Sequence, residues 1–212
     1  MDIYFIVQKS ALICEGLALL FSLIYIKKYF NTPAKLIPFY LFFVFGVELV
    51  SISLAFDNWM FNLLGVLELF VFTYIFYFTV KGKSSKKIIV SAFLGCILAL
   101  VIDAVFITKS IFTFLAIAFG FTSLGIVIMC FVYLLELAKT EKVVHQNRIL
   151  LYWVVIGLLF FHLCNLPVTV VTNDIFDIGR VNTILLIQVI TALAMYMCYI
   201  IGFIWSRKEY NY

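Results

Sequence analysis

The sequence predicts an all-α membrane protein, built as a bundle of seven transmembrane helices. Seven apolar stretches of about 20 residues run nearly end to end through the chain, and a helix of that length crosses the hydrocarbon core of a bilayer. Hydrophobic residues make up 66% of the chain and charged residues 12%, a composition far more apolar than that of a soluble domain. Because backbone groups in hydrocarbon must be bonded internally, uninterrupted apolar runs favour helices.

The predicted spans follow one another with short connections, so we expect a single membrane domain over residues 1–212 with no appended catalytic module. The first span contains Lys9 and Glu15 and lacks a preceding basic region, which favours a retained helix over a cleavable signal peptide. Pro38 falls in the first turn of the second span, where proline is tolerated. Pro167 lies well inside the sixth span and predicts a kink that serves as a hinge. In chain order the predicted spans are 4–26, 36–56, 61–80, 88–107, 111–135, 149–172 and 181–205.

The basic residues predict the orientation of the chain. Most of them follow the first, third, fifth and seventh spans, and basic loops stay in the cytoplasm. We therefore expect the N-terminus outside and the C-terminus in the cytoplasm, in the bacterial inner (plasma) membrane. This sorting explains the positive net charge without a nucleic-acid partner. The most polar loop is either only a topology determinant or a contact site for anionic lipid or for a membrane or cytoplasmic protein; its basic residues are Lys81, Lys83, Lys86 and Lys87.

Polar residues within the spans predict a buried site. An ionisable group at the centre of a membrane helix costs about 2.5–3.5 kcal/mol, so each one requires a reason. Most of these groups fall in the outer half of the bilayer, and neighbours such as His162 and Asn165 are spaced to share one helix face. We expect them to converge on one ligand or ion pocket, formed by Lys9, Glu15, Glu48, Glu68, Asp103, His162, Asn165 and Gln188.

The acidic excess of this pocket favours a cation, a proton relay or a small polar ligand with an amine, because adjacent carboxyl groups do not all ionise cheaply. The alternative is that the polar groups pair with one another and only hold the helices together. Asp103, near the end of its span, has the further alternative of reaching the lipid headgroups.

The sequence lacks the residues that several known classes of protein require. Retinal proteins require a lysine in the last span, and no lysine occurs between Lys142 and Lys208. A zinc site requires three or four protein ligands, whereas the chain has two histidines, of which His145 lies in a loop. There is no nucleophile elbow and no phosphate-binding glycine loop. We therefore expect no conventional enzyme, no metal site and no cofactor.

Several mostly apolar motifs carry a resemblance. The stretch Tyr152–His162, continued by Asn165-Leu-Pro167, resembles a group of small, uncharacterised bacterial seven-transmembrane-helix proteins, and Phe45–Leu49, Asn62–Phe70 and Tyr133–Leu137 fit the same pattern. The resemblance implies a seven-helix fold over nearly the whole chain. It also implies signalling, by association with sensor histidine kinases, but no settled activity and no functional residue.

These observations together predict a sensory or accessory membrane component. Occupation of the pocket would change helix packing near Pro167, and the basic loops would pass that change to a partner. The first alternative is a small transporter or channel for a cation, an amine or a metabolite. The second is a structural subunit of a membrane complex, whose buried polar groups only fix helix register.

Overall fold

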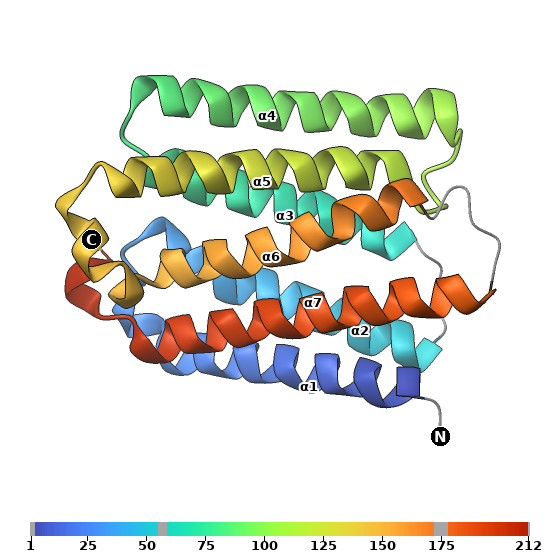
Figure 1. The fold of residues 1–212 in the computed structure, drawn as a ribbon, viewed down its shortest axis with the longest axis horizontal. Helices are drawn as coiled ribbons and strands as arrows, with labels where there is room; N and C mark the ends of the chain where they lie inside the picture. Colours follow the sequence, from blue (N-terminus) through green and yellow to red (C-terminus); the bar gives the residue numbers. More distant parts are fainter. Residues whose placement is uncertain (1–2, 55–58, 172–177, 212) are drawn as a thin grey trace.

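The fold is a bundle of long helices lying side by side (Figure 1). The computed structural model describes residues 3–54, 59–171 and 178–211, and these residues contain no strand. The long helices are α1 (Ile3–Ile24), α2 (Ile37–Leu54), α3 (Trp59–Thr79), α4 (Lys83–Ile102), α5 (Ala116–Ala138), α6 (Leu150–Val171) and α7 (Ile178–Trp205). Short helical turns lie between them or, for η5, after α7: η1 (Ile26–Lys28), η2 (Pro33–Leu36), η3 (Asp103–Ile107), η4 (Glu141–Arg148) and η5 (Lys208–Tyr210).

Length and composition identify a multi-pass membrane protein. In the described part of the chain, six segments are long and apolar enough to cross a bilayer: Pro33–Ser51, Trp59–Thr79, Lys83–Ile107, Ala116–Ala138, Leu150–Pro167 and Leu186–Trp205. Large apolar side chains such as Phe42 and Leu98, 63% and 61% exposed, point outward, as lipid-facing residues do. Side chains of α1 are described only from Lys9 onward, so its crossing, the count of seven spans and the orientation stay predictions. A single domain over residues 1–212 also stays a prediction.

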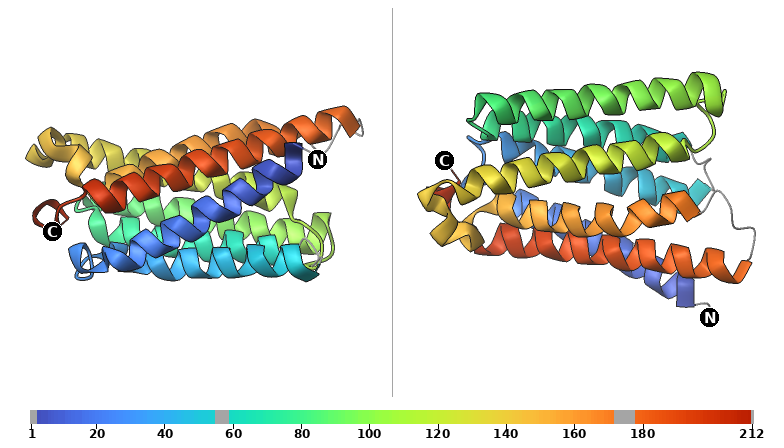
Figure 2. Two further views of the ribbon diagram at one scale, coloured as in Figure 1. Left: turned by 90° about the horizontal axis from the view of Figure 1, so that it is seen from below. Right: turned by 45° about the horizontal axis from the view of Figure 1, so that its top comes forward.

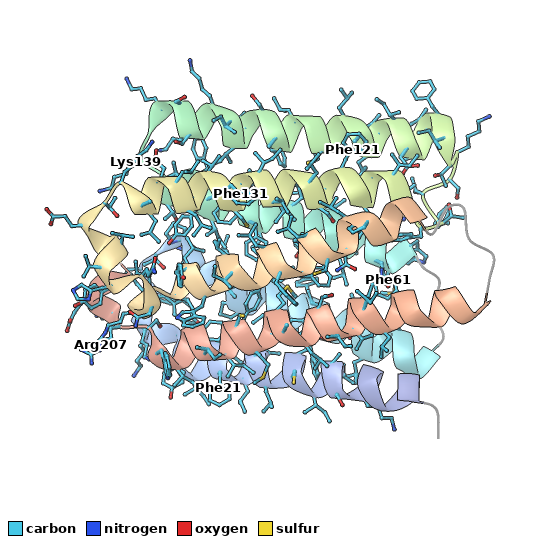
Figure 3. All side chains as sticks on the ribbon, viewed as in Figure 1. Phe21, Phe61, Phe121, Phe131, Lys139 and Arg207 are labelled. Carbon is cyan, nitrogen blue, oxygen red and sulfur yellow. The ribbon has the colours of Figure 1, made fainter. Side chains whose placement is uncertain are left out.

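The two ends of the bundle differ in charge. The connections after α1, α3 and α5 and the segment after α7 gather at one end, and the two termini lie at opposite ends (Figures 1 and 2). We call this the basic end, because it carries Lys27, Lys28, Lys35, Lys81, Lys83, Lys139, Arg148, Arg207 and Lys208. Lys139 and Arg207 mark it in Figure 3, and Phe61 marks the opposite half.

Two helices begin several residues away from the start of the predicted span. Helix α4 begins at Lys83 and not at residue 88, because its first turns are built from polar residues that precede the apolar run. Helix α5 begins at Ala116 and not at residue 111. The residues before it form a loop that Asn62 holds, since its side-chain amide donates to the carbonyls of Ile111 and Thr113 over 3.3 and 2.6 Å.

The helices differ in how deeply they are buried. Helix α4 lies at the edge and packs on α5 and α3, whereas α7 packs between α6 and α1 (Figure 1). The apolar core includes Phe72 and Phe76 of α3, Met129 of α5, Leu158 of α6 and Phe203 of α7, all fully buried.

Glycines bring α6 and α7 close together. A Cβ atom on Gly157 would lie 3.0 Å from the carbonyl oxygen of Met195, and one on Gly202 would lie 2.8 Å from the Cβ of Trp153. Small residues at such crossings are the usual means of close helix packing in membranes. The contact between α6 and α7 therefore depends on the absence of a side chain at these two positions.

Candidate functional site

A cavity of about 580 Å³ lies in the half of the bundle opposite the basic end. Its lining comes from α1, α2, α3, α6, α7 and the region around the start of α5. Four predicted site residues line it: the carboxyl groups of Glu48 and Glu68, and the amides of Asn165 and Gln188. These four residues lie on four different helices, and the fold brings their side chains to one cavity.

Glu15 extends the acidic side of the cavity. Its side chain is fully buried in α1, and its carboxyl group lies near the Glu48 carboxyl group on α2. In the described part of the chain, no donor reaches either carboxyl oxygen of Glu15. Two adjacent carboxylates are acceptors only, so they need a shared proton or a bound cation between them.

Glu68 is the centre of a second polar group. Its Oε1 accepts a hydrogen bond of 2.9 Å from the hydroxyl of Tyr40, and it lies 3.5 Å from Nε2 of His162. The other ring nitrogen of His162 lies 3.1 Å from Oγ of Ser123. At 3.5 Å the Glu68–His162 contact is an ion-pair distance, longer than a good hydrogen bond. The cluster ties α2, α3, α5 and α6 together around one carboxyl group.

Asn165 presents a further acceptor beside the cavity. Its Nδ2 donates to the carbonyl of Phe161 over 2.8 Å and lies 3.5 Å from Oγ1 of Thr191. Its Oδ1 is buried and has no donor among the described residues. Unmet acceptors next to the cavity thus lie on Glu15 and Asn165, and among the described residues the buried Nε2 of His162, 3.5 Å from Glu68, also lacks a hydrogen-bond partner.

Aromatic side chains form much of the remaining wall. These residues are Tyr40, Phe61, Phe114, Phe119, Phe161 and Tyr196. Aromatic faces attract cations when they are desolvated. The cavity thus combines acidic groups with aromatic surfaces.

Two predicted members of the pocket lie apart from it. Asp103 is 1% exposed in η3, and its carboxylate accepts hydrogen bonds from the backbone N–H of Ala118, at 2.8 Å, and from the hydroxyl of Thr108, at 2.6 Å. Its carboxylate therefore fixes the first turn of α5 to the segment that precedes it. Lys9 is exposed on α1 and does not line the cavity.

The predicted hinge residue lies at the surface of the bundle. Pro167 is exposed, and α6 continues past it to Val171. Asn165, two residues earlier, bonds the carbonyl of Phe161, one turn before itself. The side chains that follow Pro167 on α6 lie outside the described residues, and hinge motion stays a prediction.

Sequence reasoning missed the tyrosines of the site. Tyr40 belongs to a run of aromatic residues on α2, is 4% exposed and donates a hydrogen bond to Glu68. The spacing of Tyr40, Val44 and Glu48 contains the signal, because residues four apart share a helix face. Tyr196 has no such acidic neighbour four residues away.

The described residues contain no cluster of three or more metal-binding side chains. Comparison with family models, curated proteins and solved structures finds no match to this chain. The fold and the composition define the class, a multi-pass helical membrane protein, and a more specific function rests on the cavity alone.

Proposed function

We propose that the protein is a sensory or accessory membrane component whose cavity binds a small organic cation with an ammonium group. The observation that carries this proposal is the set of unmet acceptors on Glu15 and Asn165 beside the carboxyl groups of Glu48 and Glu68. A buried acceptor without a donor is costly, and an ammonium group brings up to three donors and a positive charge.

The size and the wall of the cavity support an organic cation over a bare metal ion. A volume of about 580 Å³ falls within the range of small-molecule sites, which are mostly apolar with a few placed polar groups. Rings such as Phe61 and Phe119 would contact the carbon atoms of the ligand, while the carboxyl groups would meet its ammonium group.

Signal output would pass through contacts with another protein. The cavity is lined by α6 and α7, which pack against each other and continue to the basic end. Closure of the cavity around a ligand would shift these helices, with Pro167 as the hinge. The basic segment Lys81, Lys83, Lys86 and Lys87 would meet the partner; the structure places all of it from Lys83 onward in the first turns of α4 and not in a loop. A 2.6 Å hydrogen bond from Ser85 to Glu136 fixes this end of α4 to α5.

Ligand-dependent thermal stability tests the binding. Ethylammonium should raise the melting temperature of the purified protein, because a ligand that binds only the folded state stabilises it. Glu48→Gln and Glu68→Gln should remove the increase, whereas Glu141→Gln, an exposed acid at the basic end, should keep it. Equal responses of all three variants would contradict a site in the cavity.

Transport of a cation is the second candidate. The contact of Glu68 with His162, and of His162 with Ser123, forms a line of proton-carrying groups that extends from the cavity wall into the bundle. Uptake of labelled ethylammonium into proteoliposomes, lost in Glu68→Gln, would favour transport over sensing. Carboxyl replacements that change only thermal stability would instead favour a structural subunit.

A further inference from the structure

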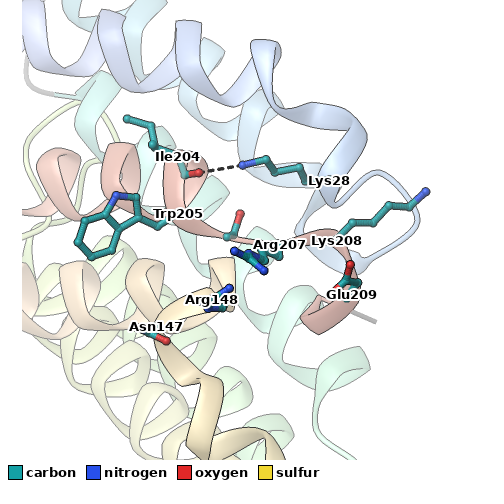
Figure 4. A pocket seen from close by; sticks show the side chains of 9 residues that line it. Lys28, Asn147, Arg148, Ile204, Trp205, Arg207, Lys208 and Glu209 are labelled. Atoms are coloured by element: carbon teal, nitrogen blue, oxygen red, sulfur yellow. Dashed lines mark hydrogen bonds between the residues drawn. The ribbon is translucent and has the colours of Figure 1, made fainter.

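A second hollow, of about 850 Å³, opens at the basic end between the start of α6 and the end of α7 (Figure 4). Four basic side chains line it, those of Lys28, Arg148, Arg207 and Lys208, against one acidic side chain, that of Glu209. We call it the basic pocket. Its lining carries a net positive charge. It shares no residue with the cavity lined by Glu48 and Glu68, called here the acidic cavity.

The walls of the basic pocket are fixed by contacts between distant parts of the chain. The backbone N–H of Arg207 donates to the carbonyl of Arg148 over 3.0 Å, which holds the two arginines next to each other (Figure 4). The ammonium group of Lys28 donates to the carbonyls of Phe203 and Ile204 at the end of α7, over 3.0 and 2.9 Å. Hydrogen bonds between distant parts of the chain therefore hold the walls of the basic pocket in place.

Several donors in the basic pocket lack an acceptor. Ser206 lines it with 1% of its surface exposed, and its buried hydroxyl has no hydrogen-bond partner in the described residues. Within that same part of the chain, neither guanidinium group, of Arg148 or Arg207, has a side-chain hydrogen bond or an ion pair. Burial also lowers the pKa of Lys28, a cost that a bound anion would offset.

We propose that the basic pocket binds a phosphate group. Arginine presents paired N–H donors that match phosphate oxygens, and a serine hydroxyl supplies one more donor. The position fits a phosphate near the membrane surface, since Trp205, 61% exposed in the lining, is the type of residue that lies at headgroup level. The phosphate belongs either to a lipid headgroup or to a soluble phosphate ester.

Binding to defined probes tests the proposal. We expect the detergent-purified protein to retain phosphatidylglycerol in native mass spectrometry. The double variant Arg148→Gln/Arg207→Gln should bind it about thirtyfold more weakly, on the basis of two lost cationic contacts. The matched control Lys35→Gln/Lys139→Gln removes the same charge from the same end but outside the pocket, and should bind within about twofold of the wild type. Equal weakening in both double variants would overturn the proposal, because it would reflect net charge alone.

Competition between the lipid and soluble phosphates distinguishes the two sources of the phosphate group. Inorganic phosphate and glycerol 3-phosphate that displace the lipid would identify the phosphate group itself as the recognised element, and soluble esters as ligands. Lipid retention that is insensitive to both would identify a headgroup site. Ser206→Ala changes no charge and should weaken the lipid or the soluble ester several-fold. Absence of binding by all three probes would overturn the proposal.

Discussion

At Asp103 one buried carboxylate holds two segments of the chain together. Replacing it with alanine leaves the N–H of Ala118 and the hydroxyl of Thr108 without their acceptor. Because the region is buried, Asp103→Ala should lower the free energy of unfolding by about 1–3 kcal/mol, measured by chemical denaturation in detergent. Glu141→Ala, at an exposed position, should change it by less than about 0.5 kcal/mol. Loss of amine binding at unchanged stability would contradict a purely structural role.

Tyr40 tests the bond that orients Glu68. Tyr40→Phe keeps the ring and removes the hydroxyl that donates to Oε1 of Glu68, so a buried carboxyl group loses a donor. We expect a loss of about 1–3 kcal/mol in unfolding free energy. Tyr74→Phe, on α3 at a side chain that is 42% exposed, should cost less than about 0.5 kcal/mol. Equal effects of the two changes would show that the Tyr40–Glu68 bond contributes nothing.

Individual residues of the site differ in whether the sequence predicts their surroundings. Spacing predicts which side chains share a helix face, and Glu48, Glu68, Asn165 and Gln188 do line one cavity. It does not predict how neighbouring helices are rotated against each other, so the partners of a buried group stay undetermined. Asp103 illustrates this: its acceptors are used by a loop and a helix start that only the fold brings near.

At the scale of the elements, the contact between α6 and α7 depends on Gly157. Gly157→Ala places a methyl group 3.0 Å from the Met195 carbonyl oxygen, so the helices must separate. We expect a loss of about 1–3 kcal/mol, the usual cost of overpacking, measured as a lower melting temperature. Gly95→Ala on α4 meets no atom within 4 Å and should leave stability unchanged or slightly raised. A neutral Gly157→Ala would contradict the close crossing.

Helix boundaries show what an apolar run measures. The second, third, sixth and seventh predicted spans agree with α2, α3, α6 and α7 to within about three residues. The fourth and fifth differ more. An apolar run predicts which residues lie in the hydrocarbon core of the bilayer, whereas backbone hydrogen bonds determine where the helix begins and ends. At α4 the helix starts before the apolar run, and at α5 apolar loop residues held by Asn62 precede the helix.

At the scale of the whole molecule, the distribution of basic residues predicts which end of the bundle faces the cytoplasm. In intact cells, a membrane-impermeant maleimide should label Ile111→Cys, at the end opposite the basic end, and should not label Ser84→Cys until the membrane is opened. The reason is retention of basic loops on the cytoplasmic side. The wild-type protein, with its native cysteines within the helices, serves as the background control. Labelling of Ser84→Cys in intact cells would reverse the proposed orientation.

The central claim is that the acidic cavity receives an organic cation, and a map of the protein with 4-bromobenzylammonium tests it most directly. We expect one anomalous bromine peak inside the cavity, against Phe61 or Phe119, with the ammonium group toward Glu48 and Glu68. The peak should be absent in Glu48→Gln/Glu68→Gln crystals. A cavity filled by a lipid chain, or a bromine peak only outside it, would contradict the claim.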